Sequence, residues 1–404
     1  MNKQIYNPSV MKRINELDLL KAIAIIAMVF IHVFDVSTRL QINSGIETPT
    51  VWIIEFMGNI PSAGVFMFAM GWGAAFSSRS TPSTYISRLR QLVILGILIN
   101  FFEHFIPSLL DPATFGTVWE IAPSIFAVDI YFFAAFAMIY FAVMKKFKEK
   151  PVAAVSISAA LIIVCFAVNA AVGYESFTTG NSWIDTVIGL FIRENEWSYF
   201  PFISWIIFPV VGYGAALLFK KATSRKAVLL FAGIMGVILI AFAEIMMAVF
   251  GIQDAVIIGA HSASEASYYA LHPLCAICGC GVIAIEFIIA NLILMISRQR
   301  LPKFMSKMSR NVMEIYIAQW LFIGCLSPVL SRITNLWVNI LFAVAVTFAS
   351  YFGAELYKWL MMKNKERRQR VQLQQSSVQS QKLHKGIPTV YVYSSTAYKK
   401  HIII

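Results

Sequence analysis

A lysine and a histidine share one side of the first apolar stretch of the sequence. Lys21 and His32 are eleven residues apart, and eleven helical steps of about 100° return to within roughly 20° of the starting direction, about 16 Å further along the axis. A neutral imidazole can take a proton from a hydroxyl or attack a thioester. The spacing predicts a reactive histidine and a cation at two depths of one helix. The alternative is structural: Lys21 extends to the interface and His32 bonds a neighbouring helix.

Two carboxylates are candidates for orienting this histidine. Asp35 follows His32 by three residues, which is within reach on a helix. Asp129 lies inside the apolar run 126–136, about two turns into a predicted span. An unpaired carboxylate there would be costly or protonated, so it needs a partner. We therefore expect Asp35 or Asp129 to act with His32. In the same way, Asp18 is expected to pair with Lys21.

Arg88 and Arg90 stand where the third apolar run begins. Guanidinium groups bind phosphates bidentately, so the two arginines and Lys21 are candidates for holding an anionic substrate. The alternative is that the arginines only fix the orientation of the chain in the membrane. Glu103 and His104, near the other end of this run, are expected to be interfacial. Three further polar residues inside apolar runs are as often structural as functional: Glu244, Glu286 and Gln319.

The composition indicates that lipid surrounds most of the chain. Hydrophobic residues make up 58% of the 404 residues and charged residues 13%, about half the usual share of a soluble domain. We expect an all-α, polytopic integral membrane protein of the cell membrane. The predicted spans are 18–37, 61–78, 91–108, 123–144, 152–172, 200–219, 227–250, 271–296, 312–330 and 336–360.

Charges between the predicted spans alternate in sign. Basic residues gather at 12–13, 79–90, 145–150, 220–226, 298–310 and 363–370, and acidic residues at 47, 111–120, 175–196 and 254–265. Basic loops remain in the cytoplasm, so ten spans with both termini cytoplasmic are expected. The net charge of +12 therefore reflects topology and not nucleic-acid binding.

The sequence divides into a membrane domain, residues 1–362, and a basic, cytoplasmic tail, residues 363–404, that is expected to be disordered. Motifs of soluble hydrolases, phosphate loops and zinc proteases are absent from the sequence. His272 and three cysteines share helical spacing, but no second ligand cluster accompanies them, so no metal is expected. The predicted cytoplasmic side carries cations, and the predicted outer side carries a histidine and carboxylates. This distribution suits an enzyme with an anionic cytoplasmic donor and an external acceptor.

The first span resembles the opening helix of the membrane-embedded acyltransferase superfamily, which includes bacterial sugar O-acyltransferases and heparan-alpha-glucosaminide N-acetyltransferase-like proteins. Residues 16–34 read ELDLLKAIAIIAMVFIHVF. The hallmark of the superfamily is a basic residue, ten intervening residues and a histidine. Here these are Lys21 and His32, with Asp18 in the usual leading position. Lysine replaces the commoner arginine, which weakens any bidentate contact.

Four further stretches carry the resemblance, which spans most of residues 14–360. Residues 64–73, 85–100 and 309–320 resemble the family's second helix, its arginine-bearing third helix and a late helix. Residues 199–220 are similar to the heparan-type branch. Two departures stand out: the arginines at 88 and 90 are closer together than in the common pattern, and Gln319 stands where a histidine is often found.

The resemblance implies transfer of an acyl group, in particular acetyl, from cytoplasmic acyl-CoA to a hydroxyl or amine of a sugar, glycolipid or envelope glycan on the outer side. It implies that His32 is the general base or the acyl carrier. Lys21, Arg88 and Arg90 would hold the coenzyme phosphates or neutralise developing charge. The acceptor, the acyl chain and the oligomeric state are not set by the sequence.

Two other classes of function fit the same polar residues. A transporter or flippase of envelope glycan intermediates would use them as a permeation path and would show paired broken helices. A membrane sensor or scaffold would not need His32. Only the enzyme would need both a thioester donor and His32 for its function, so this dependence separates it from the transporter and from the sensor or scaffold.

Overall fold

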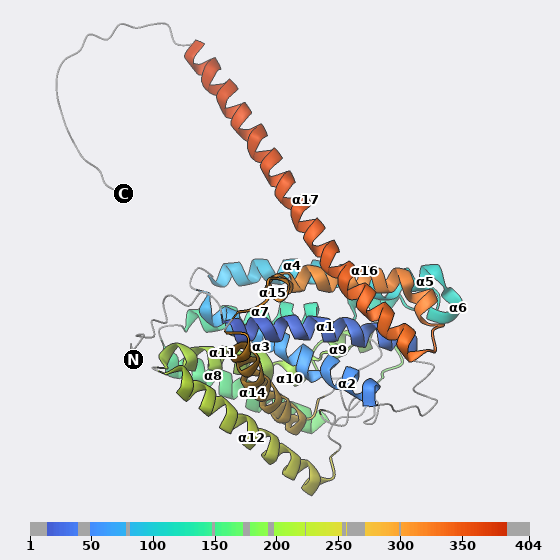
Figure 1. Cartoon of the computed structure of the whole chain (residues 1–404), viewed down its shortest axis with the longest axis vertical. Helices are drawn as coiled ribbons and strands as arrows, with labels where there is room; N and C mark the ends of the chain where they lie inside the picture. The colour runs from blue at the N-terminus through green and yellow to red at the C-terminus, as the bar shows by residue number, and fades with distance from the viewer. Residues whose placement is uncertain are drawn as a thin grey trace, which may run out of the picture. The chain divides into compact units, whose positions relative to one another are not determined.

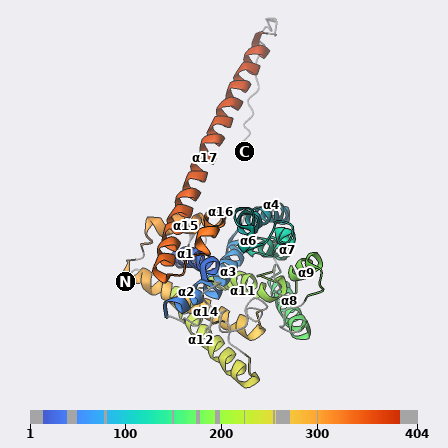
Figure 2. The same ribbon diagram turned by 90° about the vertical axis from the view of Figure 1, so that its right-hand side faces the viewer.

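The computed structural model describes residues 14–38, 49–77, 81–147, 150–172, 178–192, 198–222, 224–252, 256, 271–298 and 300–385 (Figures 1 and 2). The two termini, which the loop charges predict to be cytoplasmic, lie outside these residues. The chain forms two compact units, Met1–Ala354 and Glu355–Ile404.

The first unit is built from helices. In chain order these are α1 (Asn15–Thr38), α2 (Pro49–Gly58), α3 (Ile60–Phe76), α4 (Pro82–Asn100), the π-helix η2 (Phe101–Phe105), α5 (Ile106–Leu110), α6 (Pro112–Phe115), the 3-10 helix η3 (Ala122–Phe126), α7 (Ile130–Lys146), α8 (Pro151–Val172), α9 (Ser182–Gly189), α10 (Phe202–Trp205), α11 (Ile207–Lys221), α12 (Arg225–Phe250), α14 (Pro273–Ile296), α15 (Lys303–Arg310), α16 (Val312–Leu330) and α17 (Leu336–Lys385), which runs on into the second unit. Strand pairing among the described residues is limited to one isolated bridge, Val128 with Ser198. The predicted all-α class is confirmed.

Nine helical segments of the described chain are long and apolar enough to cross a membrane. They are Asn15–Ser37, Pro49–Phe76, Pro82–Leu110, Val152–Val172, Phe202–Lys221, Arg225–Phe250, Pro273–Ile296, Val312–Leu330 and Leu336–Arg370. The remaining predicted span, 123–144, corresponds to α7, which has only 17 residues. The prediction of a multi-pass membrane protein is confirmed, with α7 as the short member of the expected set.

The segment before α7 explains why this helix is short. Residues 122–126 form a 3-10 turn, and Asp129 is the extended N-cap residue of α7. The side-chain amide of Asn100 donates to the carbonyls of Ile125 and Ala127, at 3.0 and 2.9 Å. Irregular backbone is tolerated at membrane depth where protein groups satisfy it in this way. The prediction that Asp129 lies two turns inside a helix is therefore wrong.

Helix α1 is the central element of the first unit. It packs against α2, α3, α14, α15 and α16, as Figures 1 and 2 also show. Most of its aliphatic side chains are buried, among them Ala22, Ile25, Val29 and Val33. The helix that carries Lys21 and His32 is thus held by protein on several sides.

Helices α3 and α11 approach each other closely through two glycines. A Cβ on Gly71 would lie 2.0 Å from the carbonyl oxygen of Pro209, and a Cβ on Gly212 would lie 2.1 Å from that of Phe68. No side chain fits in either place. Small residues at such crossings permit the close van der Waals packing that drives association of membrane helices.

Three side chains cap the C-terminal end of α3. Lys145 of α7 donates to the carbonyl of Ser77, Lys220 of α11 donates to that of Ala75, and the Tyr85 hydroxyl of α4 donates to that of Ala74. Cations at a helix C-terminus satisfy its free carbonyls and interact favourably with its dipole. The caps join the ends of four helices.

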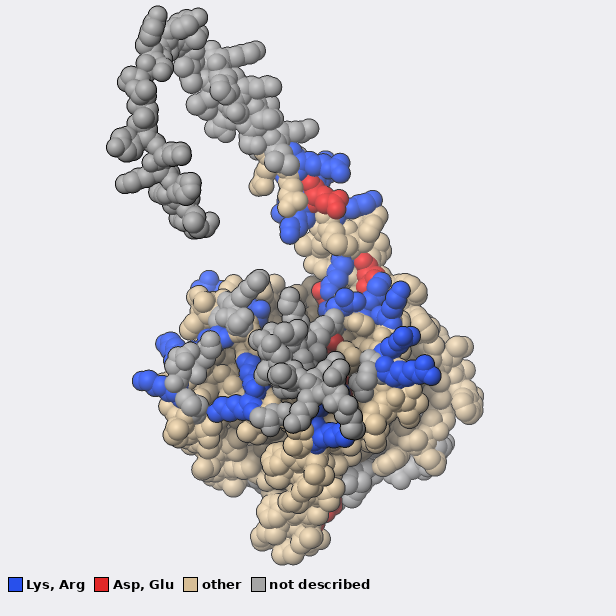
Figure 3. All heavy atoms as spheres, turned by 60° about the vertical axis from the view of Figure 1, so that its left-hand side comes forward, with Lys and Arg blue, Asp and Glu red and all other residues tan. Residues whose placement is uncertain are grey.

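Exposed lysines and arginines gather on one face of the first unit, where Figure 3 shows many blue side chains and few red ones. Exposed lysines and arginines of the described residues are found in α4, at the end of α7, just before α8, in the α11–α12 connection, after α14 and in α15, and they include Arg88, Lys146, Lys226, Arg300 and Lys307. These are the segments that the alternation of loop charges assigns to the cytoplasmic side. That assignment remains a prediction.

The second unit begins within α17. The sequence predicts a disordered tail from Lys363, whereas α17 continues to Lys385. The segment 363–385 holds no glycine or proline and is rich in Lys, Arg and Gln, which have high helix propensity. Gly386 and Pro388 follow directly. Residues 386–404 lie outside the described part of the chain.

Candidate active site

His32 is enclosed by three residues of α16. Its Nδ1 lies 2.8 Å from Nε2 of Gln319. The Trp320 ring stacks on the imidazole at 4.4 Å between centroids, and the Tyr316 ring meets its edge at 5.8 Å. Positions i, i+3 and i+4 share one face of a helix, so α16 presents all three side chains to α1 together. The aromatic rings hold the plane of the imidazole, Nδ1 is hydrogen-bonded, and no described residue forms a hydrogen bond with Nε2.

Asp129 joins this cluster through a tyrosine. The hydroxyl of Tyr316 donates to Oδ1 of Asp129 at 2.7 Å, and the second carboxylate oxygen is buried without a hydrogen-bond partner among the described residues. The carboxylate therefore orients Tyr316, whose ring contacts His32. Asp129 is thus linked to the histidine only through Tyr316, and its role toward His32 remains a prediction. Tyr131 packs on the other side, 5.5 Å from Tyr316 between ring centroids.

Glu103 and His104 lie in the π-helix η2, close to the same cluster. Their side chains are only 11% and 12% exposed and stand 3.9 Å apart, so they are not simply interfacial. The π-helix packs against α16, the helix that carries Tyr316. Pro107 has no N–H for the carbonyl of Glu103, which is a reason for the wide turn. Such turns are frequent at functional sites.

Helix α16 approaches η2 through a glycine. A Cβ on Gly324 would lie 2.1 Å from the carbonyl oxygen of Phe102. Gly324 stands four residues after Trp320, so this contact sets how deeply α16 sits beside the π-helix. The backbone packing therefore helps to place the His32 partners.

Lys21 forms the second polar centre of α1. Its Nζ lies 3.0 Å from Oδ1 of Asp18, the pairing expected from the sequence. The Ser309 hydroxyl of α15 donates to the same oxygen at 2.7 Å. These contacts tie the start of α1 to α15 and hold the ammonium group about three helical turns from His32.

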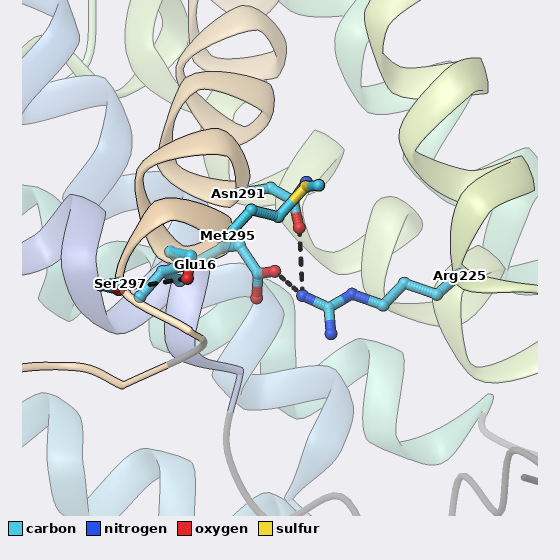
Figure 4. A network of polar contacts seen from close by, with 6 residues as sticks. Glu16, Arg225, Asn291, Met295 and Ser297 are labelled. Atoms are coloured by element: carbon cyan, nitrogen blue, oxygen red, sulfur yellow. Dashed lines mark hydrogen bonds and ion pairs between the residues drawn. The ribbon is translucent and has the colours of Figure 1, made fainter.

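An ion pair with a buried carboxylate, which the sequence did not indicate, holds the same end of α1. Glu16 is 2% exposed and pairs with Arg225 of α12, and Arg225 also donates to Oδ1 of Asn291 at 3.2 Å (Figure 4). Removing one partner of such a pair leaves an uncompensated buried charge. The contact thus fixes α1 against α12 and α14. A signal was present, because Glu16 directly precedes a long apolar run.

Arg88 and Arg90 are both exposed on the first half of α4. Residues two apart on a helix point about 200° apart, so the arginines do not share a face. The Arg88 guanidinium lies over the ring of Tyr85, 5.9 Å from its centroid. Asp35 lies one turn beyond His32 near the end of α1. Roles for Arg88, Arg90 and Asp35 remain predictions.

His272 and the cysteines of α14 are used in packing and capping. Nδ1 of His272 accepts a hydrogen bond from the backbone N–H of Leu274 at 3.1 Å, which caps the start of α14. The Cys275 thiol lies 3.6 Å from the sulfur of Met247, and Cys278 lies 3.6 Å from Oε1 of Glu244. Glu244 and Cys278 thus link α12 to α14.

An acyltransferase domain family matches residues 14–356. The chain belongs to this acyltransferase family. The match runs from the start of α1 into α17 and includes His32, Asp129 and the three α16 residues. Comparison with curated proteins and with solved structures gave no significant match. The protein is therefore a multi-pass membrane acyltransferase.

In this acyltransferase the sequence predicted roles for His32 and Asp129 and gave Gln319 as structural or functional, and these roles remain predictions; it did not point to Tyr316 and Trp320, whose rings contact His32. Aromatic residues in a membrane helix usually pack against lipid or other helices, so neither residue was distinctive. A weak signal was their spacing, since Tyr316, Gln319 and Trp320 lie on one helical face. Which partner that face meets is decided only by tertiary packing.

Proposed function

We propose that this acyltransferase moves an acyl group, in particular acetyl, from acyl-CoA on the cytoplasmic side to a hydroxyl or amine of a sugar or envelope glycan on the outer side. The observation that carries the proposal is the environment of His32. An imidazole with one nitrogen engaged by an amide and its ring fixed by an indole is suited to proton transfer or nucleophilic attack.

The chemistry needs one free imidazole nitrogen. As general base, His32 takes the proton of the acceptor hydroxyl while that oxygen attacks the thioester carbonyl. The carbon–sulfur bond then breaks, and the coenzyme thiolate leaves and recovers the proton from the imidazolium. As acyl carrier, the same nitrogen attacks the thioester and expels the coenzyme thiolate, which forms an acyl-imidazolium. The acceptor then attacks this acyl group, the carbon–nitrogen bond breaks, and the proton of the acceptor passes to the thiolate, which leaves His32 neutral again.

The placement of charge supports a donor at the basic face. Lys21, paired with Asp18, lies about 16 Å from His32 along α1, roughly half the thickness of the hydrocarbon layer. Coenzyme phosphates held near Lys21 and the arginines of α4 would leave the pantetheine arm to carry the thioester inward to His32. Asp129 would act as a positioning residue that orients Tyr316 at the acceptor side.

Sided proteoliposomes test the donor and the direction together. With the basic face turned outward, established by protease digestion of the tail after Lys363, labelled acetyl-CoA is added outside and a sugar acceptor is enclosed. We expect acylated sugar inside the vesicles and free coenzyme A outside. Product found only on the side of the donor would overturn the transmembrane direction. Absence of any thioester-dependent product across a panel of sugar acceptors would overturn the proposal.

Removal of both arginines of α4 tests the donor site. Arg88→Gln with Arg90→Gln is expected to weaken binding of acyl-CoA at least about tenfold, because charge-assisted contacts to phosphate contribute about 1.5–3 kcal/mol each. Because the two side chains point to different sides of α4, one single variant should carry most of the loss. The measurement is calorimetric titration of purified protein with coenzyme A.

A matched control is Arg298→Gln, which removes an exposed cation at the end of α14. It should bind coenzyme A as the unchanged protein does. Equal affinities of the double variant and the control would leave Arg88 and Arg90 as residues that only set the orientation of the chain.

A further inference from the structure

We propose that Gln319 is a positioning residue that selects the reactive tautomer of His32. The proposal rests on the catalytic role of His32 given above. In it, Oε1 of Gln319 accepts a hydrogen bond from Nδ1–H of the imidazole, which leaves Nε2 unprotonated and free for chemistry. Either role of His32, as base or as acyl carrier, requires this tautomer.

The geometry leaves two orientations of the Gln319 side chain, with either the amide oxygen or the NH₂ group facing the imidazole. The Gln319 amide and Nδ1 of His32 are 2.8 Å apart, so the amide engages this nitrogen and not the other. A half-turn about the last side-chain bond exchanges the amide NH₂ and oxygen at that position. If the NH₂ group faces Nδ1, the imidazole proton must sit on Nε2, and the free nitrogen has no lone pair to offer.

Burial favours the orientation with the oxygen toward the ring. With the NH₂ group facing Nδ1, Oε1 of Gln319 is buried without a donor among the described residues, which has a desolvation cost. The half-turn gives this oxygen the imidazole N–H as donor. The NH₂ group then takes the buried place of the oxygen, where it needs a carbonyl or hydroxyl oxygen of a bound acceptor as its partner.

The aromatic neighbours make the choice of nitrogen permanent. Trp320 stacks on the imidazole with 27° between the ring planes, and Tyr316 meets it at 74°. Rotation of the imidazole, which would exchange its two nitrogens, has to displace both rings. Three carboxylates lie around this cluster: Asp129 accepts from the Tyr316 hydroxyl, Glu103 lies on η2 beside α16, and Asp35 lies one turn beyond His32 on α1. Among the described residues, the hydrogen-bond partner of the His32 ring is Gln319.

Three substitutions separate this role from simple packing. Gln319→Met keeps the shape but has no hydrogen bond to Nδ1, and the maximal rate should fall about tenfold with little change in the KM for acyl-CoA. Gln319→Glu can only accept, so it should keep the tautomer and most activity. Its carboxylate stabilises the imidazolium form, so the acidic limb of the pH–rate profile should move about one unit or more to higher pH. Gln319→Lys can only donate and should be inactive.

Nitrogen NMR of protein labelled at histidine provides a readout that does not depend on activity. Assigned by comparison with His32→Gln, the His32 signals should show a protonated Nδ1 in the unchanged protein and a mixture of tautomers in Gln319→Met. A protonated Nε2 in the unchanged protein would overturn the inference. So would a Gln319→Met variant with the rate and pH profile of the unchanged protein.

The catalytic role of His32 and the positioning role of Gln319 are contradicted by different results. An active His32→Gln variant would remove the catalytic role of the histidine and with it this inference. An inactive His32→Gln variant combined with unaltered Gln319 variants would leave the proposed function intact and make Gln319 a packing residue. Each variant is compared at equal amounts of folded protein by size-exclusion chromatography.

Discussion

Replacement of His32 by glutamine is expected to lower acyl transfer at least about a hundredfold, the scale of losing acid–base catalysis. Glutamine fills a similar space and can keep a hydrogen bond to Gln319 and contact with Trp320, so the fold should survive. It cannot take a proton or form an acyl-imidazole. The measurement is the initial rate of labelled acetyl transfer by purified protein in proteoliposomes.

His272→Asn is the matched control for this experiment. His272 accepts a hydrogen bond at the start of α14, and asparagine is a good residue for that capping position. The control should transfer acyl groups at nearly the normal rate. His104 is a poorer control, because its side chain is only 12% exposed and lies 3.9 Å from Glu103. Near-normal transfer by His32→Gln would return His32 to a structural role.

Substitution of Gly212 by alanine is expected to destabilise the membrane unit strongly. The added Cβ would lie 2.1 Å from the carbonyl oxygen of Phe68, and this atom belongs to the backbone of α3 and cannot move aside alone. Overpacking of this kind costs about 1–3 kcal/mol or more. The thermal unfolding midpoint of the detergent-solubilised protein should fall clearly, with less folded protein recovered from membranes.

Gly214→Ala makes the same chemical change two residues further along α11. A Cβ there meets no atom within 4 Å, so only the change in helix propensity remains, and alanine is favoured over glycine by about 1 kcal/mol in a helix. This variant should be as stable as the unchanged protein or slightly more so. Equal midpoints for the two variants would show that the close approach of α3 and α11 does not limit stability.

Much of the architecture follows from local sequence. A run of apolar residues long enough to span hydrocarbon must be helical, because the backbone has no water to bond there. The all-α class and nearly all the spans follow from this rule. The same is true of relations within one helix. Lys21 and Asp18 pair because they are three residues apart, and Lys21 and His32 share a stripe because of the helical period.

The length of α7 and the place of Asp129 depend on a side chain far along the chain. Asn100, at the end of α4, bonds carbonyls 25 and 27 residues away and stabilises a non-helical stretch. From composition alone, that stretch is predicted to be helical because it is apolar. Local sequence also does not predict the π-helix that contains Glu103 and His104.

The sequence by itself determined a helical membrane protein whose first span carries a histidine and a lysine on one face. Only the tertiary structure decided what surrounds that histidine. Gln319 meets His32 across 287 residues, and Tyr316 meets Asp129 across 187. Such contacts depend on which faces of α1, α16 and the start of α7 meet. Close backbone approaches and buried ion pairs among many helices set that packing together, and no local periodicity encodes it.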